Sequence, residues 1–97
     1  MYFRRDVWVK NQQGQAIPGA QVFLCQQPAN VWPTLREGTP SPLQLTYSDP
    51  LGQVPLPQPV LTDGFGWAAV YALPGLYTLL VYLGGKLMQQ YTDQLLG

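Results

Sequence analysis

The sequence contains no histidine, and this absence removes much of the ordinary catalytic chemistry. Without an imidazole, no Ser-His or Cys-His pair can activate a nucleophile, and no histidine-based zinc site can form. The five acidic residues are scattered along the chain and build no paired-carboxylate motif. We therefore expect a protein that is not an enzyme and that carries no cofactor and no metal.

Charge is also scarce. Charged residues make up 10% of the chain, against roughly 25% in an average soluble domain. Five basic and five acidic residues cancel, so no basic stripe is available for phosphates and nucleic-acid binding is not expected. A weakly charged surface is poorly protected against association. This favours a chain that works inside an assembly, with an ordinary neutral domain as the alternative.

There is only one cysteine, Cys25, so a disulfide within the chain is excluded. It lies in the apolar run AQVFLCQQ and is expected to be a buried hydrophobic residue. The charges of the first ten residues are not followed by an apolar segment, so no secretory signal peptide is expected. The chain is therefore expected to fold in a reducing cytoplasm, or else to reach the outside of the cell by a route that needs no signal peptide.

Long helical patterns are missing, because ten prolines and ten glycines interrupt the chain at short intervals. The apolar runs are short, rich in Val, Tyr, Trp and Thr, and bounded by turn residues, which is typical of an all-β protein. We expect a single domain over residues 1–97. A long exposed loop is expected at 28–42, where four prolines occur. The expected strands cover about 3–10, 20–27, 43–48, 59–63, 67–73, 76–83 and 86–92.

Asp63 and Lys86 bracket 22 uncharged residues, which is long enough for a membrane helix. Pro74 and Gly75 lie in the middle of this stretch, and the residues on both sides alternate with a period of two. Two strands joined by a turn are therefore favoured, and no membrane contact is expected. Tyr77 is expected to tie down the turn with its hydroxyl, as a tyrosine corner does. The expected inward face consists of Ala68, Val70, Tyr77, Leu79 and Val81.

The opposite face of these strands is expected to be apolar and exposed, which is typical of a protein interface. Further candidate anchors are Trp32 and Leu35 in the 28–42 loop, because buried tryptophans often dominate interface energy. Three alternatives remain open: the inward and outward faces are interchanged, a loop covers the apolar face, or Trp32 folds back onto its own domain. The candidate interface residues are Trp8, Trp32, Leu35, Trp67, Tyr71, Leu80 and Tyr82.

Two short segments, SDPLG at 48–52 and TDGFG at 62–66, share the pattern [ST]-D-x-x-G. The aspartate can accept backbone N–H bonds just ahead of it, and the glycine takes the backbone angles that close the turn. Both are therefore predicted to be turns. Calcium binding by Asp49, Asp63 and Asp93 is the weaker alternative, since calcium requires about six to eight oxygen ligands at close range.

The segments 7–24, VWVKNQQGQAIPGAQVFL, and 62–81, TDGFGWAAVYALPGLYTLLV, resemble the carboxypeptidase regulatory-like, or transthyretin-like, domains. The resemblance implies a seven-stranded Greek-key β-sandwich that is transthyretin-like or Ig-like. One enzymatic branch of that family uses histidines, which this chain lacks. The matching residues are Gly14, Ile17, Pro18, Gly19, Ala20, Val22, Thr62, Asp63, Gly66, Pro74, Gly75, Tyr77, Thr78 and Leu79.

The segment 41–94 also resembles small domains of bacteriophage structural proteins, from neck, tail-fibre or capsid-decorating components. This resemblance implies a virion protein, made in the host cytoplasm, that forms homo-oligomers or contacts capsid, neck or tail proteins. A carbohydrate-binding or adhesive module is the alternative, with Trp8, Trp32 or Trp67 stacking on sugar rings. The matching residues are Tyr47, Ser48, Asp49, Gly52, Pro59, Val60, Thr62, Asp63 and Gly66.

Overall fold

The computed structural model describes residues 1–97 and contains seven strands and no helix. The all-β prediction is confirmed, and each predicted strand overlaps an observed one. The largest difference is the third strand, which is shorter and begins earlier than expected. No helix is present that has the length and apolar character needed to cross a membrane. The strands are β1 (Phe3–Trp8), β2 (Gln21–Asn30), β3 (Ser41–Leu43), β4 (Val60–Leu61), β5 (Trp67–Ala72), β6 (Gly75–Leu83) and β7 (Lys86–Leu96).

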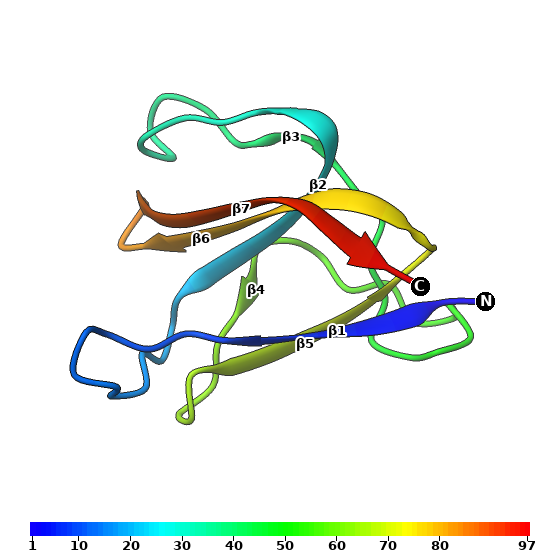
Figure 1. Ribbon diagram of the computed structural model, residues 1–97, viewed down its shortest axis with the longest axis horizontal. Helices are drawn as coiled ribbons and strands as arrows, with labels where there is room; N and C mark the ends of the chain where they lie inside the picture. Colours follow the sequence, from blue (N-terminus) through cyan, green and yellow to red (C-terminus); the bar gives the residue numbers. More distant parts are fainter.

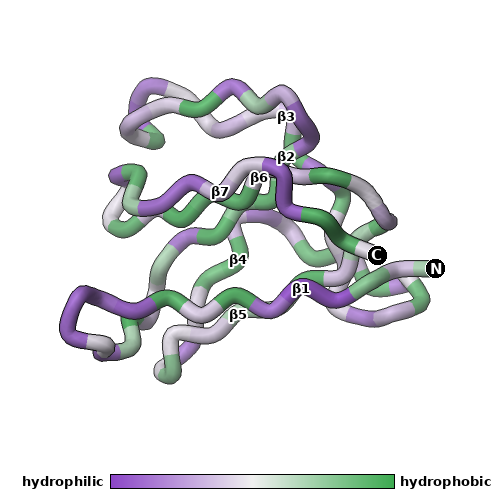
Figure 2. Tube along the Cα trace, in the orientation of Figure 1, coloured by the Kyte–Doolittle hydropathy of each residue, from purple (hydrophilic) through white to green (hydrophobic).

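The strands form two antiparallel sheets. One sheet consists of β1 and β5, and the other has the order β3-β2-β6-β7, with β4 also paired to β2. Figure 1 shows the β1/β5 sheet below the larger sheet, with both ends of the chain on the same side of the molecule. In Figure 2 the turn-rich link between β1 and β2 is hydrophilic, whereas β6 is largely hydrophobic.

The main core lies between the two sheets. The five residues predicted to face inward are all buried there, so the predicted phase of β5 and β6 is confirmed. Val7 and Val9 also point into this core, while Trp8 between them is 59% exposed, as a period of two requires. The buried residues of this core are Val7, Val9, Ala20, Val22, Leu24, Ala68, Val70, Ala72, Tyr77, Leu79, Val81 and Leu96.

A second, smaller core covers the other face of β2 and β6. It consists of Phe23, Cys25, Leu80 and Tyr82. The prediction that Leu80 and Tyr82 lie on an exposed face is therefore wrong, because both side chains are fully buried. Alternation assigns residues to one face or the other, but it does not reveal whether that face is covered.

The cover is the segment 31–40 between β2 and β3, the middle of the predicted exposed loop at 28–42; residues 28–30 belong to β2 and 41–42 to β3. The Tyr82 hydroxyl donates a hydrogen bond to the Trp32 carbonyl oxygen at 2.6 Å. The backbone N–H of Leu35 donates to the carbonyl oxygen of Gly85 at 2.8 Å, and Leu35 packs on the second core. Figure 1 shows this segment as a layer on the far side of the larger sheet from β1 and β5. The loop is therefore a structural part of the fold.

The predicted tyrosine corner is confirmed. The Tyr77 hydroxyl donates a hydrogen bond of 2.6 Å to the carbonyl oxygen of Leu73, which lies in the turn between β5 and β6. The ring of Tyr77 is 5% exposed and belongs to the main core. Its hydroxyl therefore joins the corner to the core.

Replacing Tyr77 by phenylalanine is expected to lower the free energy of unfolding by about 1 kcal/mol, because one hydrogen bond is lost while the ring stays packed. Urea unfolding would measure the change. Tyr91→Phe is the matched control, because the Tyr91 side chain is exposed and its hydroxyl makes no hydrogen bond within the protein. Equal stabilities of the two variants would contradict the role of the corner.

Both [ST]-D-x-x-G segments form the predicted turns. Asp63 Oδ1 accepts hydrogen bonds from the backbone N–H groups of Phe65 at 2.9 Å and Trp67 at 3.1 Å. Asp49 Oδ1 accepts from Gln53 at 3.0 Å and Val54 at 2.8 Å. These carboxylates therefore organise the backbone that follows each of them.

The Asp49 turn makes stability depend on pH. Hydrogen bonds from the backbone, first that of Val54, lower the pKa of the Asp49 carboxyl below its ordinary value of 3.8. A lowered folded-state pKa contributes stability above the unfolded-state value, and this contribution is lost as the pH falls through the folded value. We expect wild type to be more stable than Asp49→Asn at pH 7, and the difference to shrink as the pH falls below 3.8 and through the lowered folded-state pKa. Unfolding in urea over a series of pH values from 7 downward measures it, with Glu37→Gln as the control; a difference that does not change with pH would refute it.

Candidate interaction surface

The outer face of the β1/β5 sheet brings together five of the twelve aromatic side chains of the protein. The period of two directs Arg4, Asp6 and Trp8 away from the main core, and the register places Trp67, Ala69 and Tyr71 beside them. Tyr47 joins this sheet, because its backbone N–H and C=O both bond to Tyr71 at 2.8 Å. We call this surface the aromatic face and define it as Tyr2, Arg4, Asp6, Trp8, Tyr47, Trp67, Ala69 and Tyr71.

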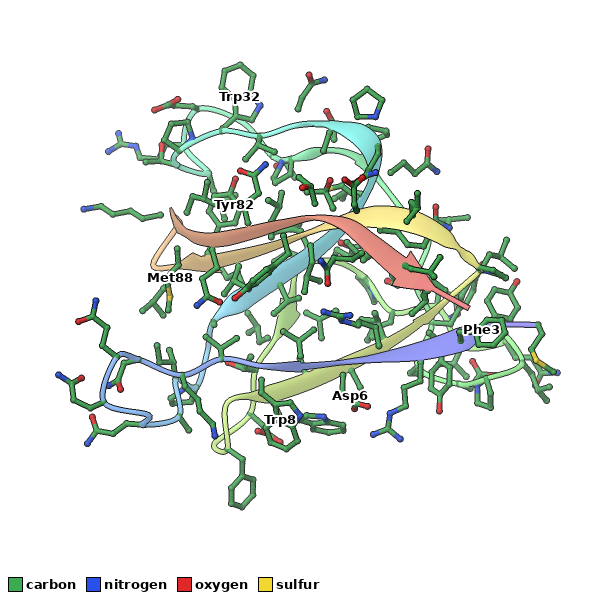
Figure 3. All side chains as sticks on the ribbon, in the orientation of Figure 1. Phe3, Asp6, Trp8, Trp32, Tyr82 and Met88 are labelled. Carbon is green, nitrogen blue, oxygen red and sulfur yellow. The ribbon has the colours of Figure 1, made fainter.

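At one end of the aromatic face two tryptophans lie together. The ring centroids of Trp8 and Trp67 are 6.1 Å apart, with the ring planes tilted by 42°. These two residues lie directly opposite each other in the β1–β5 register. Trp8 is the more exposed of the pair, so its indole is available for contact. In Figure 3, Asp6 and Trp8 lie on the side of β1 that faces away from Tyr82.

Charged groups fix the orientation of Trp67. Its indole Nε1–H donates a hydrogen bond of 2.9 Å to Asp6 Oδ1. The Arg4 guanidinium also binds Asp6 Oδ1, at 3.0 Å, and lies 5.5 Å from the centre of the Trp67 ring. An exposed ion pair of this kind adds only about 0–1 kcal/mol to stability. Its main effect is therefore to hold the indole in one position.

At the other end, three tyrosines continue the surface. Tyr2 packs edge-on against Tyr47, with ring centroids 4.9 Å apart and the planes at 65°. All three tyrosines, Tyr2, Tyr47 and Tyr71, are half-buried. Tyr71 was among the predicted interface residues, whereas Tyr2 and Tyr47 were not. Tyr2 lies two positions before Arg4, so it continues the outward-facing series Arg4, Asp6 and Trp8. This spacing could have predicted that Tyr2 lies on the same face.

A groove of about 410 Å³ runs along the edge of β5 next to the aromatic face. Its apolar walls include Leu56, Val60 and Leu61, and its rim includes Arg4 and Trp67. The Asp63 carboxylate also lines it, so the groove is mixed in character. It enlarges the surface on which an apolar side chain of a partner can lie beside the two tryptophans.

The remaining predicted interface residues lie elsewhere. Trp32 is 42% exposed, and Figure 3 places it on the opposite side of the molecule from Trp8. Leu35 is half-buried against the second core, so it serves the fold of its own chain. Leu80 and Tyr82 are buried beneath the same segment. The structure therefore brings together three of the seven predicted residues: Trp8, Trp67 and Tyr71.

Cys25 belongs to the second core, as the apolar run around it predicts. The Cys25 side chain is fully buried, and burial raises the pKa of its thiol to about 11, so the thiol stays protonated at neutral pH. No group of three or more cysteines, aspartates and glutamates lies close enough together to hold a metal ion.

Comparison with known proteins places the chain in no family: no family model, no curated protein and no solved structure matches it. The function is therefore inferred from the side chains of the aromatic face and their contacts.

Proposed function

We propose that this protein is a non-enzymatic assembly domain that binds partner proteins through the aromatic face. The observation that carries the proposal is the exposed indole of Trp8, held on a sheet beside the fixed ring of Trp67. Tryptophan, tyrosine and arginine are the residues that most often dominate binding energy in protein interfaces. All three types lie on this one surface.

The contacts within the surface support this proposal. Side chains that are already held by neighbours in the free protein lose less conformational entropy when a partner binds. Trp67 is held by Asp6 and Arg4, and Tyr2 is held against Tyr47. A surface of this kind is suited to repeated, stable contacts in an assembly.

The finer identity of the domain is also a proposal. The resemblance carried by the G-x-x-I-P-G-A and T-D-x-x-G motifs favours a transthyretin-like Greek-key β-sandwich, and the two antiparallel sheets are compatible with it. The resemblance to bacteriophage neck, tail-fibre and capsid-decorating domains favours a virion as the assembly, with homo-oligomeric contacts or contacts to capsid, neck or tail proteins.

The experiment compares Trp8→Ala with the matched control Trp32→Ala. Each variant replaces the wild-type protein in the virus that encodes it, and purified particles are analysed by quantitative mass spectrometry. We expect Trp8→Ala to reduce the copies per particle by about tenfold or more, since hot-spot truncation costs about 2 kcal/mol or more. Trp32→Ala is expected to leave the copy number unchanged. Absence of the wild-type chain from particles would refute the virion proposal.

Carbohydrate binding is the second candidate, and one observation favours it. The exposed ring of Trp8 lies beside Trp67, whose indole contacts the carboxylate of Asp6 and the guanidinium of Arg4, groups that can accept and donate hydrogen bonds. Titration with oligosaccharides, followed by the indole NMR resonances of Trp8 and Trp67, tests this candidate. Saturable shifts at these two resonances, with none at Trp32, would favour sugar binding over a protein partner.

A further inference from the structure

The outer edge of β1 carries unpaired backbone groups. β1 pairs only with β5, and the bond between Val9 N–H and the Gly66 carbonyl oxygen fixes which residues face that partner. The backbone N–H and C=O groups of the odd-numbered residues of β1 point toward β5. Those of Arg4, Asp6 and Trp8 therefore point to the open edge. No backbone or side-chain hydrogen bond within the chain covers these groups. Such an edge is a template for another strand.

We infer that a second copy of this chain pairs with this edge, with the two β1 strands antiparallel and Arg4 of each copy opposite Asp6 of the other. In this register the backbone of Arg4 exchanges hydrogen bonds with the backbone of Asp6 in the other copy. The two-fold symmetry produces this pair twice. Trp8 then lies opposite Tyr2 of the second copy. Both kinds of cross-strand pair, opposite charges and two aromatics, stabilise a sheet.

The charges select this register over its neighbours. Backbone pairing allows shifts of the second strand only in steps that keep Arg4, Asp6 and Trp8 on the shared edge. The next register in one direction places Asp6 opposite Asp6, and the next in the other direction places Arg4 opposite Arg4. Like charges directly opposite each other destabilise a strand pair. The sequence RRD in β1 therefore fits one antiparallel alignment with itself.

One like-charge pair remains, because Arg5 lies on the two-fold axis of this arrangement. The Arg5 guanidinium donates a hydrogen bond of 2.8 Å to Gln94 Oε1 on β7 of its own chain. This bond directs the charge toward β7 and the interior between the sheets. The residual repulsion weakens the dimer at low ionic strength, and added salt screens it.

The pairing would merge two aromatic faces into one four-stranded sheet, with the order β5-β1-β1-β5. It deepens the proposed function, since it names the first partner of that surface as a second copy. The competing explanation is that Arg4, Arg5 and Asp6 protect a solitary edge against pairing, as charges on edge strands often do. The two explanations predict opposite results in the following experiments.

The first experiment is a disulfide at the two-fold axis. Residues opposite each other in a non-hydrogen-bonded pair have Cα atoms about 4.5 Å apart, which is within the range that a disulfide bridges. Arg5→Cys is therefore expected to form a covalent dimer under mild oxidation. Lys10→Cys, which lies beyond the paired strands, is the matched control and is expected to remain monomeric. Cys25 is buried and does not interfere. Equal, slow cross-linking of both variants would overturn the inference.

The second experiment tests the register by exchanging charges and follows self-association by sedimentation equilibrium. Arg4→Asp alone and Asp6→Arg alone each place like charges opposite each other twice, and each is expected to raise the dimer dissociation constant roughly tenfold. The double variant Arg4→Asp/Asp6→Arg is expected to restore dimerisation. A wild-type protein that stays monomeric up to about 1 mM, or a double variant as weak as the single ones, would refute the pairing.

Failure of this inference is distinguishable from failure of the proposed function. A monomeric wild type that is still incorporated into particles in a Trp8-dependent manner leaves the proposed function standing and removes the dimer. A wild-type protein that forms the dimer but is absent from particles supports the pairing and contradicts the proposed role in a virion.

Discussion

Replacing Tyr82 by alanine is expected to lower the free energy of unfolding by about 3–5 kcal/mol, the usual range for removing a fully buried aromatic ring. The side chain is fully buried, and its ring packs edge-on against Phe23, with centroids 5.5 Å apart. Its hydroxyl also holds the 31–40 segment at the Trp32 carbonyl oxygen. A loss of this size is a large part of the roughly 5–15 kcal/mol that stabilises a typical domain.

Chemical denaturation measures the effect, and two variants calibrate it. Tyr82→Phe keeps the ring and loses the hydrogen bond, so it is expected to cost about 1 kcal/mol. Trp8→Ala removes an exposed ring and is expected to cost no more than about 1 kcal/mol, mostly from its packing on Trp67. If Tyr82→Ala were no more costly than Trp8→Ala, the 31–40 segment would not cover the second core.

This contrast shows what alternation in a sequence can and cannot reveal. The period of two correctly separated Leu79 and Val81 from Leu80 and Tyr82, because side chains of a strand point to opposite faces by geometry. It gave no information on whether the second face meets solvent. That depends on Leu35 and its neighbours, which lie more than forty positions earlier in the chain and show no periodicity.

The candidate surface was predictable to a similar extent. Trp8, Trp67 and Tyr71 were identified because each is a large side chain in the solvent-facing phase of a strand. Tyr47 was missed, because its place depends on two backbone bonds to Tyr71, 24 positions away. Non-local pairings of this kind arise from the tertiary fold and leave no local pattern. The turn motifs were easier to predict, since an aspartate and a glycine in one short segment determine each of them.

Replacing Gly66 by alanine is the second change with a large expected effect, because two independent costs fall on one position. Gly66 has φ of +73°, a conformation that costs an L-residue about 1–2 kcal/mol. A Cβ atom built there would lie 2.5 Å from the carbonyl oxygen of Val9 and 3.1 Å from the amide nitrogen of Ile17. These two groups are hydrogen-bonded to each other at 2.9 Å. The Val9 N–H also bonds to the Gly66 carbonyl oxygen, so the new methyl group forces apart the junction of β1 and β5.

We therefore expect Gly66→Ala to lower the free energy of unfolding by about 3 kcal/mol or more, as overpacking adds about 1–3 kcal/mol to the backbone strain. Gly14→Ala separates the two costs, because Gly14 has nearly the same φ, +79°, with no atom within 4 Å of the added Cβ. Its expected loss is the strain alone, about 1–2 kcal/mol. Urea unfolding of both variants gives the difference. Equal losses would mean that the chain around Val9 relaxes freely, whereas a larger loss at Gly66 identifies the T-D-x-x-G glycine as the point where the two strands of the aromatic face are held together.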